Sequence, residues 1–378
     1  MKRVTDAFAA EYGGRPDFVA RAPGRVNLIG EHTDYNDGFC LPMAIDRATW
    51  IALRPREGEV SVHALDMADA LTFALDALSR EGADWGRYVT GVAWALQENG
   101  YTLAGWEGVL SGDVPIGSGL SSSAALEMVV ARAFAAVSGF AWDATRMAQI
   151  AQQTENHWLG LQSGIMDQLI SANGIAGHAL LMDCRSLALT PVPLPPGTSI
   201  VVMDTRTPRG LVNSAYNERR AECERAAAAL GVPALRDAGP AALARAADRL
   251  DPVVFRRARH VITENERTLA AAEALRANAA ATLGALMNAS HDSLRDDYEV
   301  TSGTLDAMVE SARRQPGCLG ARMTGAGFGG CAIALVRAVA VAPFIAAVSR
   351  EYEQRTGLTP DLFVAQPADG ASLVESAS

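Results

Sequence analysis

The chain has 378 residues, enough for two domains, and 49% of them are hydrophobic, which is sufficient for a packed interior. The net charge of −10 is spread along the sequence, which argues against a nucleic-acid surface but allows a locally positive cleft for a small anion. The five cysteines are scattered without a CxxC pair, no apolar run approaches the ~20 residues of a membrane helix, and the start lacks an apolar signal core. These features predict a cytoplasmic protein with no membrane partner.

In the first half of the chain, apolar segments rich in β-branched and aromatic residues predict strands that are mixed with helices. Residues 17–32 (DFVARAPGRVNLIGEH) indicate a strand, a Pro-Gly turn and a second strand. Further strands are expected at 48–55 and 59–65, and residues 106–115 indicate a strand followed by a turn. Helices are expected at 87–100, 122–139 and 143–160, each closed by a glycine, with Asp143 as the N-cap of the third.

A proline-rich stretch at residues 190–199 (TPVPLPPGTS) is expected to hold little regular structure and to separate two domains, 1–190 and 191–378. Beyond it, strands are expected at 200–205, 331–336 and 361–365, and helices rich in alanine and arginine at 217–231 and 251–275. Strands mixed with helices, with few βαβ repeats, predict an α+β fold in two lobes rather than a doubly wound sheet.

The chain contains one lysine, Lys2, among its 33 basic residues. A Walker A loop and a protein kinase each require a lysine at the phosphates, so the sequence excludes both classes. Schiff-base chemistry is disfavoured for the same reason. Any phosphate that this chain binds must therefore be held by arginines, backbone amides, hydroxyls or a metal ion.

Residues 117–123 (GSGLSSS), here called the serine loop, join a predicted strand to a predicted helix. A flexible linker is one interpretation, although no domain boundary lies here, and a plain turn with serine caps is another. The third is a phosphate-binding loop, because a helix N-terminus exposes unpaired amides and glycines let the backbone close around phosphates. Serine hydroxyls can also bond phosphate oxygens or ligate Mg²⁺.

Residues 24–38 (GRVNLIGEHTDYNDG), here called the signature segment, place charged groups beside glycines, which is unusual for a surface turn. Glu31 and Asp34 offer acceptors for several hydroxyls, as recognition of a small polyol requires. N-capping acids with a loop salt bridge are the structural alternative. A metal site is disfavoured because His32 has no second histidine at ligand spacing.

Asp167 stands in an apolar stretch, where an unpaired acid costs free energy. It is either a buried helix cap or a catalytic base whose neighbours set its pKa. Glu155, twelve residues upstream, offers a second carboxylate, and a carboxylate near a phosphate-binding loop suits Mg²⁺.

A late glycine run, MTGAGFGGCAIALV (323–336), contains the spacing GxGxxG at Gly325, Gly327 and Gly330. The dinucleotide-binding fingerprint should follow a strand and open a helix, but the residues after this run indicate a strand. A Rossmann dehydrogenase is therefore disfavoured. The glycines are better explained by backbone packed closely against another loop or a ligand.

Taken together, the signature segment and residues 115–127, 163–168, 214–223 and 323–331 resemble the GHMP kinases, and among them the galactokinase family. The similarity runs through nearly the whole chain. It implies a two-lobed α+β fold with mixed or antiparallel sheets and an active site in the cleft between the lobes. It also implies ATP-dependent phosphorylation of galactose at the anomeric oxygen, with ATP and Mg²⁺ as cofactors, no nucleic-acid partner and a monomeric state.

The resemblance implies a role for each candidate residue. Arg25 would stabilise the transferred charge and keep the base ionised, and Asp167 would accept the proton of the anomeric hydroxyl. Ser123 and Glu155 would hold Mg²⁺. The implied sugar-binding residues are Glu31, His32, Thr33, Asp34, Gly164 and Tyr216, and the implied ATP-binding residues are Gly117, Ser118, Gly119, Leu120, Ser121, Ser122 and Ser123.

Two alternatives stay open on the sequence. A related kinase for N-acetylgalactosamine or arabinose would keep most of these motifs, although the N-acetylgalactosamine kinases depart from the pattern at the position of Thr33. A non-catalytic, sugar-responsive regulator would be expected to alter the serine loop or to lose Asp167, and this chain keeps both.

Overall fold

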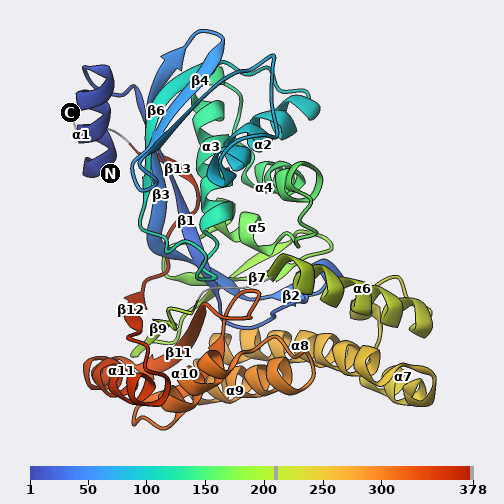
Figure 1. The fold of residues 1–378 in the computed structure, drawn as a ribbon. Coiled ribbons are helices and arrows are strands. Elements are labelled where there is room, and N and C mark those ends of the chain that lie inside the picture. The colour runs from blue at the N-terminus through green and yellow to red at the C-terminus, as the bar shows by residue number, and fades with distance from the viewer. Residues whose placement is uncertain (208–211, 375–378) are drawn as a thin grey trace.

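The computed structural model describes residues 1–207 and 212–374, which form two lobes (Figure 1). In the upper lobe, six strands of the described chain form one sheet in the order β13-β1-β3-β6-β4-β5. All neighbours in this sheet are antiparallel except β4 and β6, which are parallel. The strands are β1 (Phe18–Asn27), β3 (Pro42–Arg56), β4 (Glu59–Ala64), β5 (Asp69–Ala74), β6 (Gly105–Gly112) and β13 (Ser372–Val374).

Helices cover both faces of this sheet (Figure 1). One face packs against α2 (Asp84–Glu98), α3 (Ser122–Ser138), α4 (Ala144–Gln153) and α5 (Met166–Asn173), and α1 (Lys2–Tyr12) lies on the other. The larger core contains Trp106 of β6, whose ring lies edge-on to Phe134 of α3. Because α3 and α5 pack directly on β1, the sheet sets the position of both helices in the lobe.

The lower lobe is built on an antiparallel sheet, which in the described residues has the order β10-β11-β9-β12. Its strands are β9 (Thr198–Asp204), β10 (Cys318–Met323), β11 (Cys331–Arg337) and β12 (Asp361–Ala365). Its helices are α6 (Val212–Leu230), α7 (Pro240–Arg245), α8 (Pro252–Arg276), α9 (Ala280–Asp296), α10 (Gly303–Arg313) and α11 (Val341–Thr356), with 3₁₀ turns at Leu235–Asp237, Ala247–Arg249 and Ala338–Ala340.

The two lobes share a hydrophobic core. Alternate residues of β9 point to opposite faces, so Val201 packs with α10 and α11 whereas Val202 faces the upper lobe. There it meets Leu28 and Met43 from the segments around β1 and β3. A small sheet of β2 (Phe39–Cys40), β7 (His178–Asp183) and β8 (Leu189–Pro193) lies between the lobes. Residues of both lobes therefore pack together in one hydrophobic cluster.

The structure confirms the predicted two-lobed α+β fold, with three local corrections. The expected turn at Pro23-Gly24 is wrong, because β1 continues through it with only a register shift between Pro23 and Arg25. The helix expected at 143–160 ends as α4 at Gln153 and continues as a π-helix, Thr154–Leu159. The proline-rich stretch contains β8, an edge strand that pairs only with β7 among the described strands, which is where prolines are tolerated.

The domain division at residue 190 stays a prediction. The strand β8 runs across this position, and β13, near the end of the chain, pairs with β1 of the upper lobe. No helix among the described residues combines the length and the apolar character needed to cross a membrane.

Candidate active site

A cavity of about 1130 Å³ opens between the lobes. The signature segment, the serine loop and the start of α5 line it from the upper lobe, and Tyr216 of α6, Gly325 and Ala326 line it from the lower lobe. Four of the segments singled out in the sequence therefore meet at one place, although they are far apart along the chain: the signature segment, the serine loop, the stretch around Asp167 and the late glycine run.

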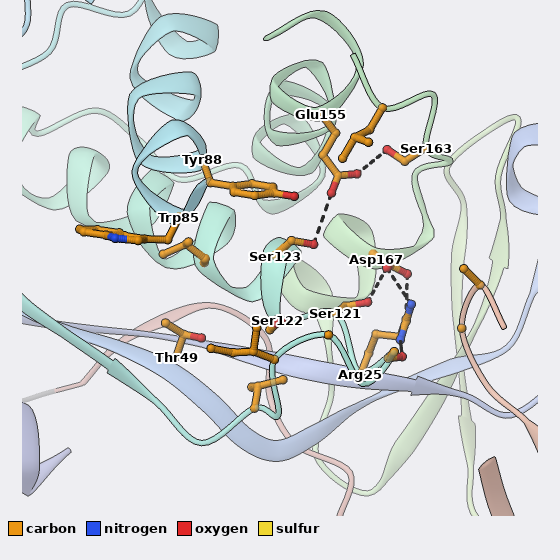
Figure 2. A pocket seen from close by; sticks show the side chains of 18 of the residues that line it. Arg25, Thr49, Trp85, Tyr88, Ser121, Ser122, Ser123, Glu155, Ser163 and Asp167 are labelled. Atoms are coloured by element: carbon orange, nitrogen blue, oxygen red, sulfur yellow. Dashed lines mark hydrogen bonds and ion pairs between the residues drawn. The ribbon is translucent and has the colours of Figure 1, made fainter. Parts of the chain in front are cut away.

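Arg25 and Asp167 line this cavity and form a bidentate ion pair (Figure 2). The Nε of Arg25 donates to Oδ1 of Asp167 at 2.8 Å, and its Nη2 donates to Oδ2 at 2.7 Å. The hydroxyl of Ser121 also donates to Oδ2. The Arg25 side chain is 4% exposed and the Asp167 side chain 31%, so the arginine is buried whereas the carboxylate faces the cavity.

Local backbone geometry directs Arg25 into the cavity. The register shift in β1 lies at Gly24, where a Cβ would lie 2.8 Å from the carbonyl oxygen of Leu120. The strand can therefore approach the serine loop, and Arg25 donates through Nη1 to the carbonyl of Gly119. Burial lowers the pKa of a guanidinium, but Asp167 and Glu31 outweigh burial and raise the pKa of Arg25. The arginine is thus held as a cation.

The serine loop leads into α3 with its backbone in the left-handed region. The φ angles are 70° at Gly117, 92° at Gly119 and 58° at Ser121. Ser121 is the N-cap of α3, but its hydroxyl bonds Asp167, so this side chain does not cap the first amides of the helix. Two predicted ATP-binding side chains point elsewhere: Ser118 donates to the carbonyl of Pro115 at 2.8 Å, and Leu120 is buried in the shared core.

Ser123 and Glu155 meet on the wall of the cavity, beside Asp167 (Figure 2). The Ser123 hydroxyl donates to Oε1 of Glu155 at 3.3 Å, and Ser163 donates to Oε2. Glu155 lies in the π-helix, an irregularity that often marks a functional site. Burial raises the pKa of Glu155, and Asp167 raises it further.

This donor set fits Mg²⁺. A carboxylate beside a hydroxyl supplies the hard oxygen ligands that the ion prefers. The described residues contain no cluster of three or more His, Cys, Asp or Glu side chains, so the protein would provide few ligands and substrate phosphates or waters the others.

Glu31 points into the cavity from a buried position that two elements of the lower lobe support. Its Oε1 accepts from the backbone amide of Gly325 at 2.6 Å and lies 3.4 Å from Nη1 of Arg322 on β10. Burial raises the pKa of Glu31, whereas Arg322 and Arg25 oppose that shift. The late glycine run joins strand β10 to strand β11. It supports the signature segment directly, because the amide of Gly325 donates to Glu31.

Asp34 lies directly against Gly164, and both line the cavity together with Asp167. A Cβ on Gly164 would lie 1.9 Å from Oδ2 of Asp34, so only glycine allows this approach. Burial, and then the charges of Asp167 and Glu31, raise the pKa of Asp34 to about 7. A group of acids that repel one another is suited to several hydroxyl donors.

His32 and Thr33 are engaged by the protein itself. The Nε2 of His32 lies 3.2 Å from the carbonyl oxygen of Ala326, which can only accept, so Nε2 carries the proton and Nδ1 accepts from Tyr35 at 2.8 Å. Burial, followed by the nearby His260, lowers the pKa of His32 to about 3, so its ring is neutral. Thr33 is fully buried and donates to backbone carbonyls rather than lining the cavity. Sugar contact by either side chain stays a prediction.

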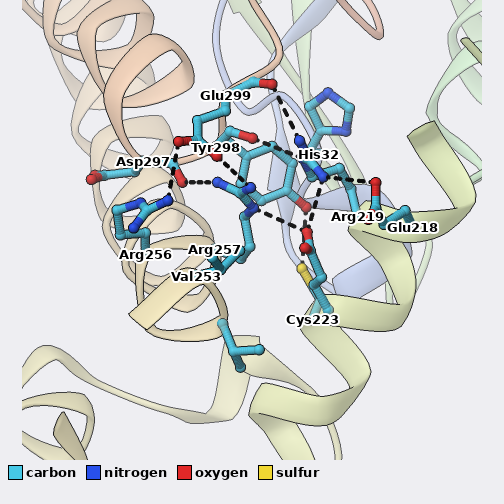
Figure 3. A network of polar contacts seen from close by, with 12 residues as sticks. His32, Glu218, Arg219, Cys223, Val253, Arg256, Arg257, Asp297, Tyr298 and Glu299 are labelled. Atoms are coloured by element: carbon cyan, nitrogen blue, oxygen red, sulfur yellow. Dashed lines mark hydrogen bonds and ion pairs between the residues drawn. The ribbon is translucent and has the colours of Figure 1, made fainter. Parts of the chain in front are cut away.

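Tyr216 lines the cavity from α6, and a polar network anchors that helix (Figure 3). Arg219 donates through Nε to the carbonyl of Tyr298 at 2.8 Å and through Nη1 to Glu222 at 3.1 Å. Arg257 of α8 also donates to Glu222, at 3.0 Å. The ring of Tyr216 lies 5.5 Å from that of His32, so α6 completes the aromatic surroundings of the signature segment.

Three models of protein families match the chain. The galactokinase galactose-binding signature matches residues 6–55, the GHMP kinase N-terminal domain residues 87–174 and the GHMP kinase C-terminal domain residues 271–354. A galactokinase of Roseiflexus sp. is 47% identical over 377 residues, which cover 98% of this chain and 96% of the relative. A galactokinase of Chloroflexus aurantiacus is 48% identical over 375 residues, with 97% and 96% covered.

The chain belongs to the galactokinase family. As members of a kinase family, such proteins use ATP as the phosphoryl donor. The crystal structure of Lactococcus lactis galactokinase complexed with galactose superimposes with a TM-score of 0.94 at 38% identity, covering 97% of this chain and 98% of that one. Mevalonate kinase of Methanococcus jannaschii, at 18% identity and a TM-score of 0.65 over 93% and 98% of the two chains, shares the fold.

Sequence reasoning missed one wall of the cavity in this member of the galactokinase family. Trp85 and Tyr88 on α2 and Thr49 on β3 line it beyond the serine loop (Figure 2), together with Met67, Leu110, Val114 and Ile116. Ile116 is 66% exposed, an unusual exposure for an isoleucine next to a glycine-rich loop. The amphipathic pattern of α2 predicts a helix, but it does not show that these two rings face a cavity.

Proposed function

We propose that this chain transfers the γ-phosphoryl group of ATP to the anomeric oxygen of galactose. The observation that carries the proposal is the position of Asp167, which faces the cavity between the acids of the signature segment and the serine loop. The match to the galactokinase galactose-binding signature over residues 6–55 supports galactose as the acceptor.

Asp167 is the proposed base. Among the described contacts, its Oδ2 accepts from both Arg25 and Ser121, whereas Oδ1 accepts from Arg25 alone. Oδ1 therefore keeps more capacity to accept a proton from the sugar hydroxyl. The fixed fork of Arg25 orients the carboxylate and adds positive charge where the phosphoryl group is transferred.

The serine loop is the proposed phosphate site. The amides at the start of α3 and the partial positive charge of the helix N-terminus suit the phosphates of ATP. Ser123 and Glu155 are the proposed protein ligands of Mg²⁺, which when bound supplies positive charge that neutralises the phosphates. The apolar wall with Trp85 and Tyr88 suits the adenine base.

The proposed sugar-binding residues are Glu31, Asp34, Gly164 and Tyr216. The backbone of His32 and Thr33 lies between the two acids. Phosphoryl transfer depends mostly on positioning and charge stabilisation, so these residues act by holding the anomeric hydroxyl next to Asp167. One chain forms the whole cavity, which supports a monomer as the working unit. The use of ATP supports the expected cytoplasmic location.

A panel of sugars in an ADP-release assay tests the choice of acceptor. Galactose should give a much higher kcat/KM than N-acetylgalactosamine or arabinose, because a site built to bond each hydroxyl rejects an altered sugar. A higher kcat/KM for either of the other sugars would contradict galactose as the substrate.

A further inference from the structure

One buried face of α8 is turned toward the signature segment. His260, Glu264 and Thr268 recur at every fourth position and so share this face, with Asn265 beside them. All four side chains are at most 8% exposed. Of the described residues that line the cavity, none is among these four, so α8 can act on a substrate only through the segment it contacts.

The side chains of α8 bond the backbone at both ends of the turn that carries Glu31 and Asp34. The Oε1 of Glu264 accepts from the amide of Gly30 at 3.0 Å. The Nε2 of His260 lies 3.1 Å from the carbonyl oxygen of Glu31 and donates to it, because a carbonyl only accepts. At the far end, Oδ1 of Asn265 accepts from the amide of Phe39 at 2.9 Å.

The glycines of the signature segment allow this close approach. A Cβ on Gly30 would lie 2.9 Å from Oγ1 of Thr268 and 2.5 Å from the carbonyl oxygen of Phe39, and the φ of Gly30 is 95°. A Cβ on Gly38 would collide with Oδ1 of Asn265. Packing against α8 therefore requires glycine at the two positions that flank the acids.

Glu264 is held as a charged acceptor in this contact. Its carboxylate also accepts from Ser290 of α9 at 2.5 Å and from Nε of Arg267 at 2.7 Å. Burial raises the pKa of a carboxyl, but Arg267 and other nearby groups outweigh burial and lower the pKa of Glu264 to about 2. A hydrogen bond to an ionised acceptor is stronger than a neutral one and fixes the Gly30 amide more tightly.

We propose that Glu264 is a positioning residue for the sugar, which holds the Gly30–Glu31 peptide so that the acids of the signature segment meet the sugar hydroxyls. The inference rests on the proposed function, because it takes the signature segment as the sugar site. Through this contact α8, a helix of the lower lobe outside the cavity, controls the affinity for the sugar but not the affinity for ATP. A misplacement of the acids by about 1 Å is enough to weaken their action strongly.

The test compares Glu264→Gln, which keeps the size of the side chain but removes its charge, with Ser290→Ala as the matched control. Ser290 bonds the same carboxylate oxygen from an equally buried position but has no contact with the signature segment among the described hydrogen bonds. Galactose Kd is measured by calorimetric titration without ATP, and the KM for ATP and the Tm are measured for each variant. Glu264→Gln should raise the galactose Kd by about ten-fold or more and leave the KM for ATP within about two-fold.

The control should lower the Tm but keep the galactose Kd. A Glu264→Gln protein that binds galactose as tightly as the wild type, or that loses ATP and galactose affinity alike, would overturn the inference. If that variant does not fold, Glu264→Asp replaces it, because this change keeps the charge beside Arg267 but draws it back from Gly30. Unchanged galactose affinity, or an equal loss of galactose and ATP affinity, would again overturn the inference. A wild-type protein that neither binds nor phosphorylates galactose would instead refute the proposed function.

Discussion

Alanine in place of Gly164 would separate sugar binding from ATP binding by a purely steric change. The new Cβ would lie 1.9 Å from Oδ2 and 2.1 Å from Cγ of Asp34, well inside the 3.4 Å at which ordinary contact begins. Asp34 must then move by about 1.5 Å, and displacements of about 1 Å at an active site cost on the order of 10²-fold in rate. We therefore expect kcat/KM for galactose to fall by about 10²-fold and the KM for ATP to stay within about three-fold.

Steady-state kinetics with each substrate varied in turn measures both constants. Gly303→Ala is the matched control, because a Cβ at Gly303 meets nothing within 4 Å. A second check adds Gly164→Ala to Asp34→Ala: if the collision with Asp34 is the cause, the glycine substitution should cost much less once that carboxylate is absent. Normal galactose kinetics in Gly164→Ala, or the same loss in both backgrounds, would show that a collision with Asp34 does not control galactose turnover.

Three further changes test the remaining parts of the site. Asp167→Asn keeps the shape of the base but should lower kcat by about 10²–10⁴-fold with galactose affinity largely kept, as measured by turnover and calorimetry, and near-normal turnover would place the base elsewhere. Ser123→Ala removes one proposed Mg²⁺ ligand and should raise the Mg²⁺ concentration needed for half-maximal rate, whereas an unchanged metal dependence would remove this assignment. Asp34→Asn tests the pKa of Asp34, which burial and neighbouring acids raise to about 7. Above that pH the wild type carries a buried charge that the amide lacks, and below it both side chains are neutral, so the variant's gain in Tm should be larger near about pH 8 than near about pH 5.5. An equal gain at both pH values would contradict the raised pKa.

The sequence allowed the fold class and most elements to be predicted, because these depend on local patterns. The helix that begins at the serine loop ends at Gly139, in the left-handed conformation that glycine favours, and Asp143 caps α4 by accepting from the amide of Arg146. The pattern failed at Pro23-Gly24, where glycine serves a close approach to Leu120 rather than a turn. A local pattern does not distinguish these two uses of glycine.

The parts of the site that could not be predicted depend on contacts between distant residues. Gly30 and Glu264 are 234 positions apart, and nothing in the pattern of α8 marks Glu264 as different from its other acids. Sequence reasoning likewise grouped Thr33 with Glu31 and Asp34, but the turn directs the Thr33 hydroxyl back onto its own carbonyls. The side chains of neighbours in a motif can therefore contact different groups.

Transfer of labelled phosphate from γ-labelled ATP to galactose is the most direct test of whether this chain phosphorylates the anomeric oxygen with Asp167 as the base. The product is separated from ATP, its phosphorylated position is assigned by NMR, and the wild type is compared with Asp167→Asn. We expect the wild type to place the label on the anomeric oxygen of galactose and Asp167→Asn to form this product more slowly, by about 10²–10⁴-fold. Label on a different hydroxyl, or no labelled sugar while ATP is still hydrolysed, would show that the proposed function is wrong.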